Sequence, residues 1–136
     1  MDPSISCETI RVRFAETDLM GIVHHANYFL YFEEGRVEWL RRRGVTYADW
    51  AAKGVHLPVV EVGLKYRSPA RFDDRIVVET KISQVRSVSV LFTYRIHRDE
   101  TLLAEGSTRL GCIDGQSKLM RIPEEMRRVL LGGETI

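Results

Sequence analysis

The sequence TDLMGIVHHANYFLYFEEGRVEWLRRRG, residues 17–44, decides the fold. From Tyr28 onward it contains no proline, and Asn27 can cap a helix because its side-chain oxygen accepts a free N–H of the first turn. Three arginines at 41–43 and then Gly44 are helix stop signals at the other end. The stretch therefore predicts one long helix.

The first half of this helix is apolar on nearly every side. Residues 28–32, YFLYF, leave no polar face, and such a helix belongs inside a protein. Gly35 costs roughly 1 kcal/mol relative to alanine in a helix interior, and we attribute it to close packing against a sheet. The rest of the chain must wrap this helix.

Strand patterns before and after the helix can supply the wrapping. In the first run, Ile10, Val12 and Phe14 alternate with arginines, as in a half-buried strand. The order is one strand, the long helix, four strands and a short helix after Pro123. This order predicts an α+β fold, one antiparallel sheet of about five strands wrapped around a long central helix. The open sheet edges predict a dimer at least. The expected strands are residues 9–14, 60–66, 76–82, 88–96 and 102–113.

Length and composition place the chain among ordinary globular proteins. Its 136 residues predict a single domain over residues 1–136. Lys and Arg total 20 against 19 Asp and Glu, so no global charge points to nucleic acid. No run approaches the ~20 apolar residues of a membrane span, and no secretory signal opens the chain. We therefore expect a cytoplasmic protein with no membrane span and no nucleic-acid partner.

The residues just before the helix carry the candidate chemistry. Met20 to Val23 lets the chain turn back, which brings Asp18 toward the helix start. A helix start presents unpaired N–H groups and a partial positive charge that can polarise a carbonyl oxygen. A carboxylate beside it could attack that carbonyl or activate water. The combination suits acyl transfer or hydrolysis without metal or serine, although residue statistics alone favour an Asx turn or a cap for Asp18 by about three to one.

The same stretch resembles the signature of the hotdog-fold acyl-CoA thioesterases of the 4-hydroxybenzoyl-CoA thioesterase type. That pattern reads approximately D-x-x-G-x-V, then a histidine or another residue, a tyrosine, and an acidic residue and arginine at helix spacing. A second segment, YRSPARFDD at residues 66–74, is similar to the family's connection between two strands. The likeness covers nearly the whole chain. Its first motif is matched in register by Asp18, Gly21, Val23, His25, Tyr28, Glu33 and Arg36.

The resemblance implies a hotdog fold and a thioester hydrolase that needs no metal or cofactor. Asp18 would be the catalytic carboxylate, as a nucleophile or as a general base on water. The backbone N–H of His25 would polarise the thioester carbonyl, and its side chain would orient water or Asp18. Glu16 stands where many relatives have Asp, and we expect little consequence from this departure.

The resemblance also implies where substrate binds. Gly21, Val23 and Tyr28 would line the acyl site, and the family usually places two sites at a dimer interface. Arg86 and Ser87, at a turn between two strands, are candidates for contact with CoA, although a solvated turn arginine fits them equally well. We expect acyl-CoA as the substrate and a homodimer or homotetramer as the assembly.

Other functions keep the same fold. An acyl carrier protein thioesterase would use a different thiol carrier, and a non-catalytic acyl-CoA binding module would bind without turnover. The retained Asp18 argues against the binding module, and the Asp18-x-x-Gly21 motif does not fit the hotdog dehydratases. His24 and His25 are not expected to hold a metal, because adjacent histidines point apart in most backbones and no third ligand is spaced nearby.

Overall fold

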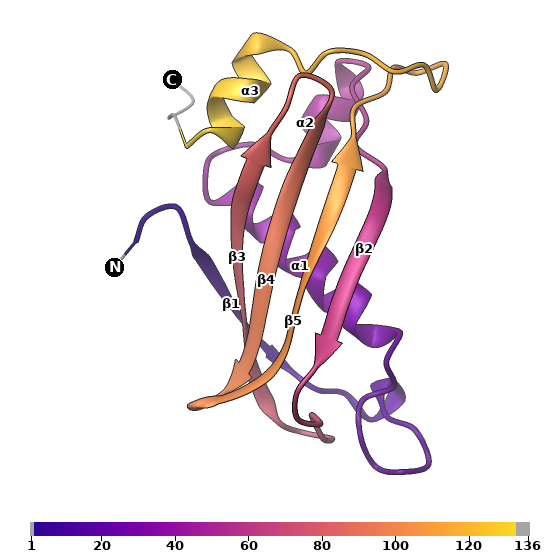
Figure 1. The fold of residues 1–136 in the computed structure, drawn as a ribbon, viewed down its shortest axis with the longest axis vertical. Helices are drawn as coiled ribbons and strands as arrows, with labels where there is room; N and C mark the ends of the chain where they lie inside the picture. The colour runs from indigo at the N-terminus through magenta and orange to yellow at the C-terminus, as the bar shows by residue number, and fades with distance from the viewer. Residues whose placement is uncertain (1, 133–136) are drawn as a thin grey trace.

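The computed structural model describes residues 2–132, in which five strands form one antiparallel sheet and a long helix lies across one face (Figure 1). The predicted α+β architecture is confirmed. The expected domain runs from residue 1 to residue 136, and these two bounds lie outside the described range. None of the helices in that range has the length and hydrophobicity to cross a membrane. The cytoplasmic location stays a prediction. The elements are β1 (Ser6–Arg11), η1 (Phe14–Glu16), α1 (Asn27–Arg41), α2 (Tyr47–Ala52), β2 (Val59–Tyr66), β3 (Arg75–Val85), β4 (Ser89–Arg98), β5 (Thr101–Gly111) and α3 (Glu124–Leu130).

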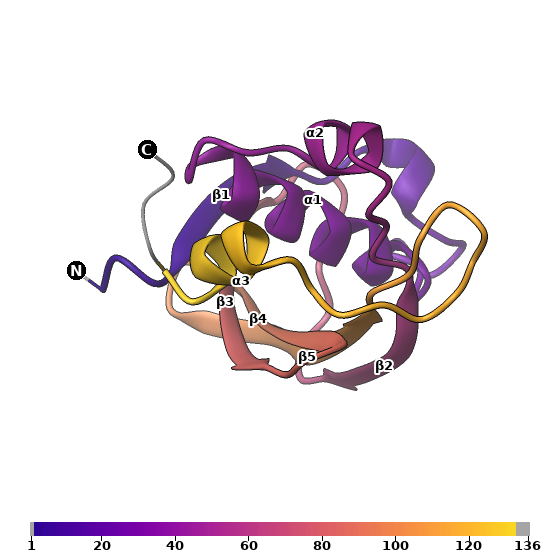
Figure 2. The ribbon, with the colours of Figure 1, turned by 90° about the horizontal axis from the view of Figure 1, so that it is seen from above.

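The strand order β1-β3-β4-β5-β2 leaves β1 and β2 at the two edges of the sheet. Antiparallel pairing joins every neighbouring pair, and short turns connect β3, β4 and β5. Seen from above, the sheet curls around α1 (Figure 2). The β4–β5 hairpin and the start of α1 lie at one end of the molecule, whereas the β3–β4 turn and α3 lie at the other (Figure 1).

Close helix–sheet packing explains the small residues that interrupt both elements. A Cβ added to Gly35 would lie 3.0 Å from Val78 Cγ1 and closer still to Thr80 Oγ1, so the expected close approach at Gly35 is confirmed. Gly106 plays the matching role on β5, because a Cβ there would lie 2.7 Å from the ring of Phe32. The two glycines therefore allow α1 to pack closely against the middle of the sheet.

The helix is buried on one side only, which corrects the expectation of an all-round apolar burial. Tyr28, Tyr31 and Phe32 are buried, but Phe29 and Leu30 remain 43% and 51% exposed. One curled sheet covers only one side of a helix, and the exposed positions of α1 are Phe29, Leu30, Glu33, Glu34 and Arg41.

Two local predictions at the N-terminal side are wrong for one shared reason. The strand expected over residues 9–14 ends at Arg11, and Phe14 lies in η1 with 76% of its surface exposed. Asn27 is the first helical residue rather than the cap, and its amide donates to the Glu16 carbonyl over 2.9 Å. Both departures arise because the chain folds tightly around Glu16.

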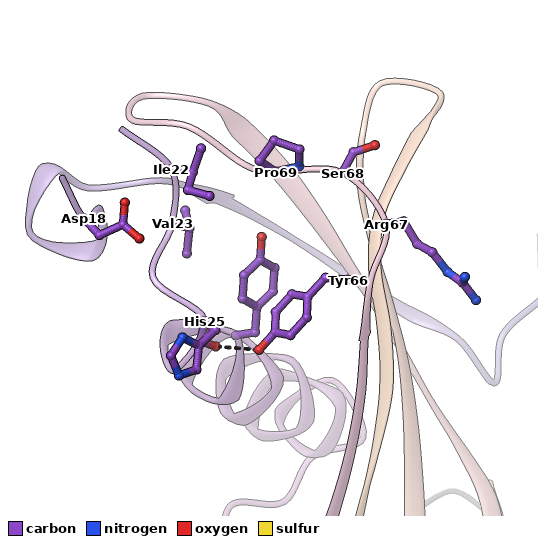
Figure 3. Close-up of a pocket in the computed structure, with 9 residues that line it drawn as sticks. Asp18, Ile22, Val23, His25, Tyr66, Arg67, Ser68 and Pro69 are labelled. Carbon is purple, nitrogen blue, oxygen red and sulfur yellow. Dashed lines mark hydrogen bonds between the residues drawn. The ribbon is translucent and has the colours of Figure 1, made fainter. Parts of the chain in front are cut away.

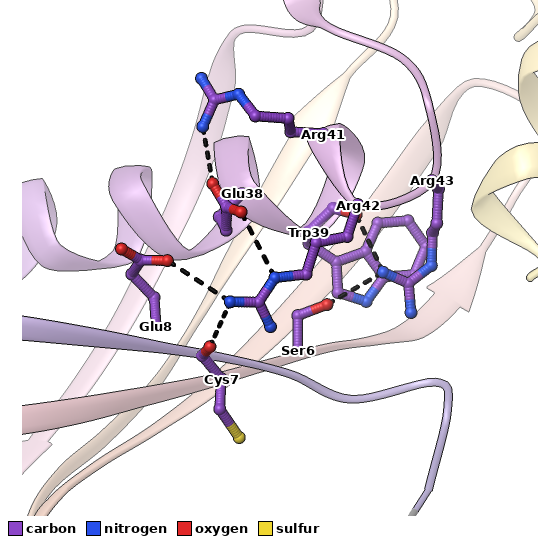
Figure 4. Close-up of polar contacts among 8 residues, drawn as sticks. All are labelled: Ser6, Cys7, Glu8, Glu38, Trp39, Arg41, Arg42 and Arg43. Atoms are coloured by element: carbon purple, nitrogen blue, oxygen red, sulfur yellow. Dashed lines mark hydrogen bonds and ion pairs between the residues drawn. The ribbon is translucent and has the colours of Figure 1, made fainter.

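Two of the three arginines at the far end of α1, Arg42 and Arg43, hold β1 (Figure 4). Arg42 donates to the Cys7 carbonyl and pairs with Glu38, and Arg43 donates to Ser6 Oγ over 2.9 Å. The Arg43 guanidinium also lies 3.5 Å from the centroid of the Trp39 ring, a cation–π contact. These contacts fix the helix at the end opposite the candidate site.

Candidate active site

A small hairpin carries Asp18 toward the start of α1. The Asp18 N–H donates to the Ile22 carbonyl over 2.9 Å, and the Gly21 N–H donates to the Asp18 carbonyl over 3.0 Å. Gly21 has a φ of +77°, a left-handed conformation that glycine adopts without steric cost. Asp18 Oδ1 accepts from the Met20 N–H over 2.8 Å, which is an Asx turn. The predicted turn is confirmed, and the Asx interpretation holds for one of the two carboxylate oxygens.

The hairpin docks on the connection between β2 and β3. The Val23 N–H donates to the Ala70 carbonyl over 2.8 Å, and Ile22 forms an isolated antiparallel bridge with Arg71. The Val23 side chain is only 4% exposed, so the hairpin is anchored by both backbone and packing. The two sequence segments that carry the thioesterase resemblance therefore meet in space.

The backbone turns at His24 and His25 before α1 begins. The Tyr28 N–H reaches the His25 carbonyl over 3.3 Å, and the Tyr66 hydroxyl donates to the same carbonyl over 3.2 Å. The N–H of His25 has no acceptor among residues 2–132. It lies beside the positive end of the α1 dipole, so it is available to a ligand oxygen.

Asp18, the His25 corner and Tyr28 enclose one pocket of about 360 Å³. Figure 3 shows the Asp18 carboxylate on one side and His25 with Tyr66 on another, with Pro69 closing the far wall. Burial raises the pKa of Tyr28, so its phenol stays neutral at physiological pH, and Asp18 is the only carboxylate in the lining. The lining residues are Asp18, Ile22, Val23, His25, Tyr28, Tyr66, Arg67, Ser68 and Pro69.

Glu16 is the residue whose importance the sequence did not reveal. Its side chain, in a residue only 6% exposed, accepts from the Tyr31 hydroxyl over 2.8 Å and from the Arg13 backbone N–H over 2.9 Å. Burial alone would raise the pKa of this carboxyl, but these donors together with the Arg13 side chain lower it below its ordinary value. Glu16 is therefore a buried, charged group. No capping-box signature marks Glu16 in the sequence, because Arg13 stands where that motif has a serine or threonine acceptor.

Arg86 and Ser87 lie at the other end of the sheet. They form the β3–β4 turn, where the Arg86 N–H donates to the Ser89 carbonyl over 2.8 Å and the Ser87 carbonyl accepts from Ile122 over 2.9 Å. Neither residue lines the pocket around Asp18. Within one protomer, the five substrate-binding candidates therefore lie in two places. Gly21, Val23 and Tyr28 are at the site, whereas Arg86 and Ser87 are at the opposite end of the sheet.

The two adjacent histidines do not point apart, which corrects that expectation. The rings of His24 and His25 lie tilted on one another with centroids 4.1 Å apart. Within residues 2–132, no group of three or more His, Cys, Asp or Glu side chains is arranged to hold a metal ion. The two rings lie together at the corner that precedes α1.

A curled five-stranded antiparallel sheet around one helix is the architecture of the hotdog fold. The chain belongs to the thioesterase-like superfamily, whose family model matches residues 12–130. It is 35% identical over 106 residues to the acyl-CoA thioester hydrolase YbgC of Escherichia coli O6:H1, a match that covers 77% of this chain and 79% of the relative.

Solved structures agree with this assignment. A hypothetical protein, TT1821 from Thermus thermophilus, is 46% identical, with a TM-score of 0.90 over 93% of this chain and 98% of that one. The DHNA-CoA thioesterase of Staphylococcus aureus is 30% identical, with a TM-score of 0.83 over 86% and 80% of the two chains. The hotdog fold expected from the sequence is confirmed.

Proposed function

We propose that this protein hydrolyses acyl-CoA thioesters to the free acid and CoA. The observation that carries the proposal is the meeting of one carboxylate, Asp18, and one unpaired backbone N–H, that of His25, in a single pocket at a helix start. The related hydrolases act on the same kind of bond. A thioester carbonyl bound between these two groups meets a nucleophile on one side and a hydrogen-bond donor on the other.

Asp18 has two chemically balanced routes. Its Oδ2 can attack the thioester carbon, expel the CoA thiolate and form a mixed anhydride that water then hydrolyses. Alternatively, the carboxylate removes a proton from water, which attacks the carbon while the C–S bond breaks. Because Oδ1 is held by the Met20 N–H, the other oxygen is the one available for either route.

The His25 N–H and the α1 dipole stabilise the oxygen that becomes negative during the reaction. Removing a single hydrogen-bond donor from an oxyanion hole costs about 3–4 kcal/mol of transition-state stabilisation. The donor is held in place because the His25 carbonyl is tied to the Tyr66 hydroxyl and to the first turn of α1. The buried Tyr28 and Val23 give the acyl group an apolar wall.

We further propose a homodimer that pairs the β2 edges of two copies. Seven of the eight residues in β2 are exposed, although Val60 and Val62 are apolar. Phe29 and Leu30 extend this apolar surface onto α1. Joining two β2 strands would satisfy the open backbone groups and bury these side chains together. A homotetramer would then be a pair of such dimers.

This dimer accounts for the position of Arg86 and Ser87. Antiparallel pairing of two β2 strands about a two-fold axis reverses the second copy, so its β3–β4 turn comes to the end that holds the first copy's pocket. This turn joins the strands that lie two and three positions inward from β2, so at a strand spacing of about 4.8 Å it lies roughly 10–15 Å from the joined edges. Arg86 and Ser87 of one copy would thereby face CoA bound to the other.

The decisive experiment compares the wild type with Asp18→Asn on a panel of acyl-CoAs, from acetyl to palmitoyl with benzoyl and hydroxybenzoyl, by release of free thiol. Asparagine keeps the Oδ1 acceptor for Met20 but removes the charge. Turnover should fall at least ~100-fold, the scale of a positioned general base. Asp114→Asn is the matched control, because Asp114 Oδ1 accepts from the Gln116 N–H over 2.8 Å in another Asx turn.

Each outcome has a distinct meaning. Equal turnover by wild type and Asp18→Asn would refute the role of Asp18, and binding without turnover by both would favour the acyl-CoA binding module. Hydrolysis of acyl carrier protein thioesters that free CoA does not inhibit would favour the carrier-protein enzyme.

A further inference from the structure

We propose that Glu16 is a positioning residue that holds the two reacting groups of the site, Asp18 and the His25 N–H, at a fixed separation. This inference rests on the proposed function and adds a residue to it. Glu16 lies two positions before Asp18, on the same tight turn of chain, and it contacts the other side of the site through both its side chain and its backbone.

The side chain binds Glu16 to the helix. Glu16 Oε1 accepts from the hydroxyl of Tyr31, one turn into α1, over 2.8 Å. The same oxygen accepts from the Arg13 N–H over 2.9 Å, and Oε2 accepts from Arg13 Nε over 3.0 Å. Tyr31 is itself 2% exposed, so its hydroxyl has little access to water as a substitute partner. The acid is thus held by three donors from two segments.

The backbone of Glu16 binds the residues on either side of the other reacting group. Its carbonyl accepts from the His24 N–H over 2.8 Å and from the Asn27 side-chain amide over 2.9 Å. The His24 N–H belongs to the peptide just before the unpaired His25 N–H. A shift of Glu16 therefore moves the oxyanion donor and the Asp18 hairpin relative to each other.

A purely structural tie does not need a charge here. Burying a carboxylate is costly, and apolar residues of similar size commonly serve as well or better for stability. The charge does strengthen and orient each hydrogen bond that it accepts. The Glu16 carboxylate is bound by Tyr31 of the helix and by Arg13, and the Glu16 carbonyl binds the His24 N–H. This arrangement is suited to placing Asp18 and the His25 N–H precisely.

The test uses Glu16→Gln, Tyr31→Phe and the double variant, with kcat and KM measured on the best acyl-CoA of the panel. We expect Glu16→Gln to lower kcat by about 10-fold or more with KM little changed, because small misplacements of reacting groups can cost up to ~100-fold. The double variant should lose little more than the larger single loss, because both changes weaken the same contact between the residue-16 side chain and the Tyr31 hydroxyl. Glu38→Gln is the matched control, since Glu38 also pairs with arginines at 2.6 and 3.3 Å, far from the site.

Amide hydrogen exchange provides a readout that needs no turnover. The His24 N–H should lose protection in Glu16→Gln and keep it in Glu38→Gln. If Glu16→Gln only lowers the melting temperature, with kcat and His24 exchange unchanged, the inference is overturned. An inactive wild type would instead refute the proposed function, and the exchange result would still decide whether Glu16 positions the corner.

Discussion

Replacing Gly35 with alanine should destabilise the protein, although alanine is the better helix former. Gly35 lies where α1 crosses β3, and an added Cβ would lie 3.0 Å from Val78 Cγ1 and nearer still to Thr80 Oγ1. Thr80 is fully buried and β-branched, so its side chain has little freedom to turn away. The helix and the sheet must therefore separate slightly.

The two opposing contributions can be estimated. Alanine in a helix interior gains about 1 kcal/mol over glycine. Forcing a methyl group into a packed core costs typically about 1–3 kcal/mol, and two contacts this short place Gly35→Ala in the upper part of that range. We expect a net loss of about 1–2 kcal/mol in the free energy of unfolding. Gly35 lies eight residues, or about 12 Å, along α1 from Asn27. A displacement of the helix at Gly35 would also shift the helix start at the candidate site, so kcat should fall as well.

Urea unfolding at one fixed protomer concentration measures this loss, because assembly makes apparent stability depend on concentration. Gly115→Ala is the control, since a Cβ there meets nothing within 4 Å. In a Thr80→Ala background the main obstacle is gone, and Gly35→Ala should become neutral or stabilising by up to ~1 kcal/mol. A clash with Thr80 would be refuted if Gly35→Ala stabilises the wild type, or if the loss in the free energy of unfolding is the same in both backgrounds.

Val62→Lys should give monomers at micromolar concentration in sedimentation velocity, because it places a charge in the proposed β2–β2 seam, whereas Glu61→Gln on the outer face of that strand should remain dimeric. Arg86→Ala should raise KM for acyl-CoA but not for an acyl-pantetheine that lacks the nucleotide; equal effects on both would contradict CoA binding by Arg86. The lowered pKa of Glu16 stabilises the fold above the unfolded value of about 4.5, and this contribution is lost as pH falls through the lower folded value. The melting temperatures of wild type and Glu16→Gln should therefore converge as the pH is lowered below 4.5; a constant difference from pH 7 to 3 would contradict it.

The elements that the sequence predicts well are those decided by neighbouring residues. The expected strands at 60–66, 76–82, 88–96 and 102–113 match β2 to β5 to within three residues at each end. The close packing at Gly35 could be predicted because glycine destabilises a helix, and such a residue is expected only where a close contact requires it. Each of these inferences needed only local spacing and an estimate of cost.

The errors concern contacts between segments far apart in the chain. Phe29 and Leu30 looked buried because composition reveals that a helix is apolar, but not how much of it one sheet can cover. The partner of Glu16, Tyr31, is 15 residues away, and periodicity carries no information about that pair. Asn27 was read as a cap by residue type, whereas Glu16 uses its amide as a donor.

The two interpretations of Asp18 turn out to be compatible. As a turn residue it accepts a hydrogen bond from the Met20 N–H at one carboxylate oxygen, and this contact fixes the side chain in one orientation. A surface carboxylate without such a restraint would lose rotational freedom each time it met a substrate, and that loss would add to the barrier. The Asx turn removes this cost in advance and leaves the second oxygen for chemistry. Residue statistics that favour a turn for this aspartate therefore do not argue against catalysis, because the turn is what makes the carboxylate effective.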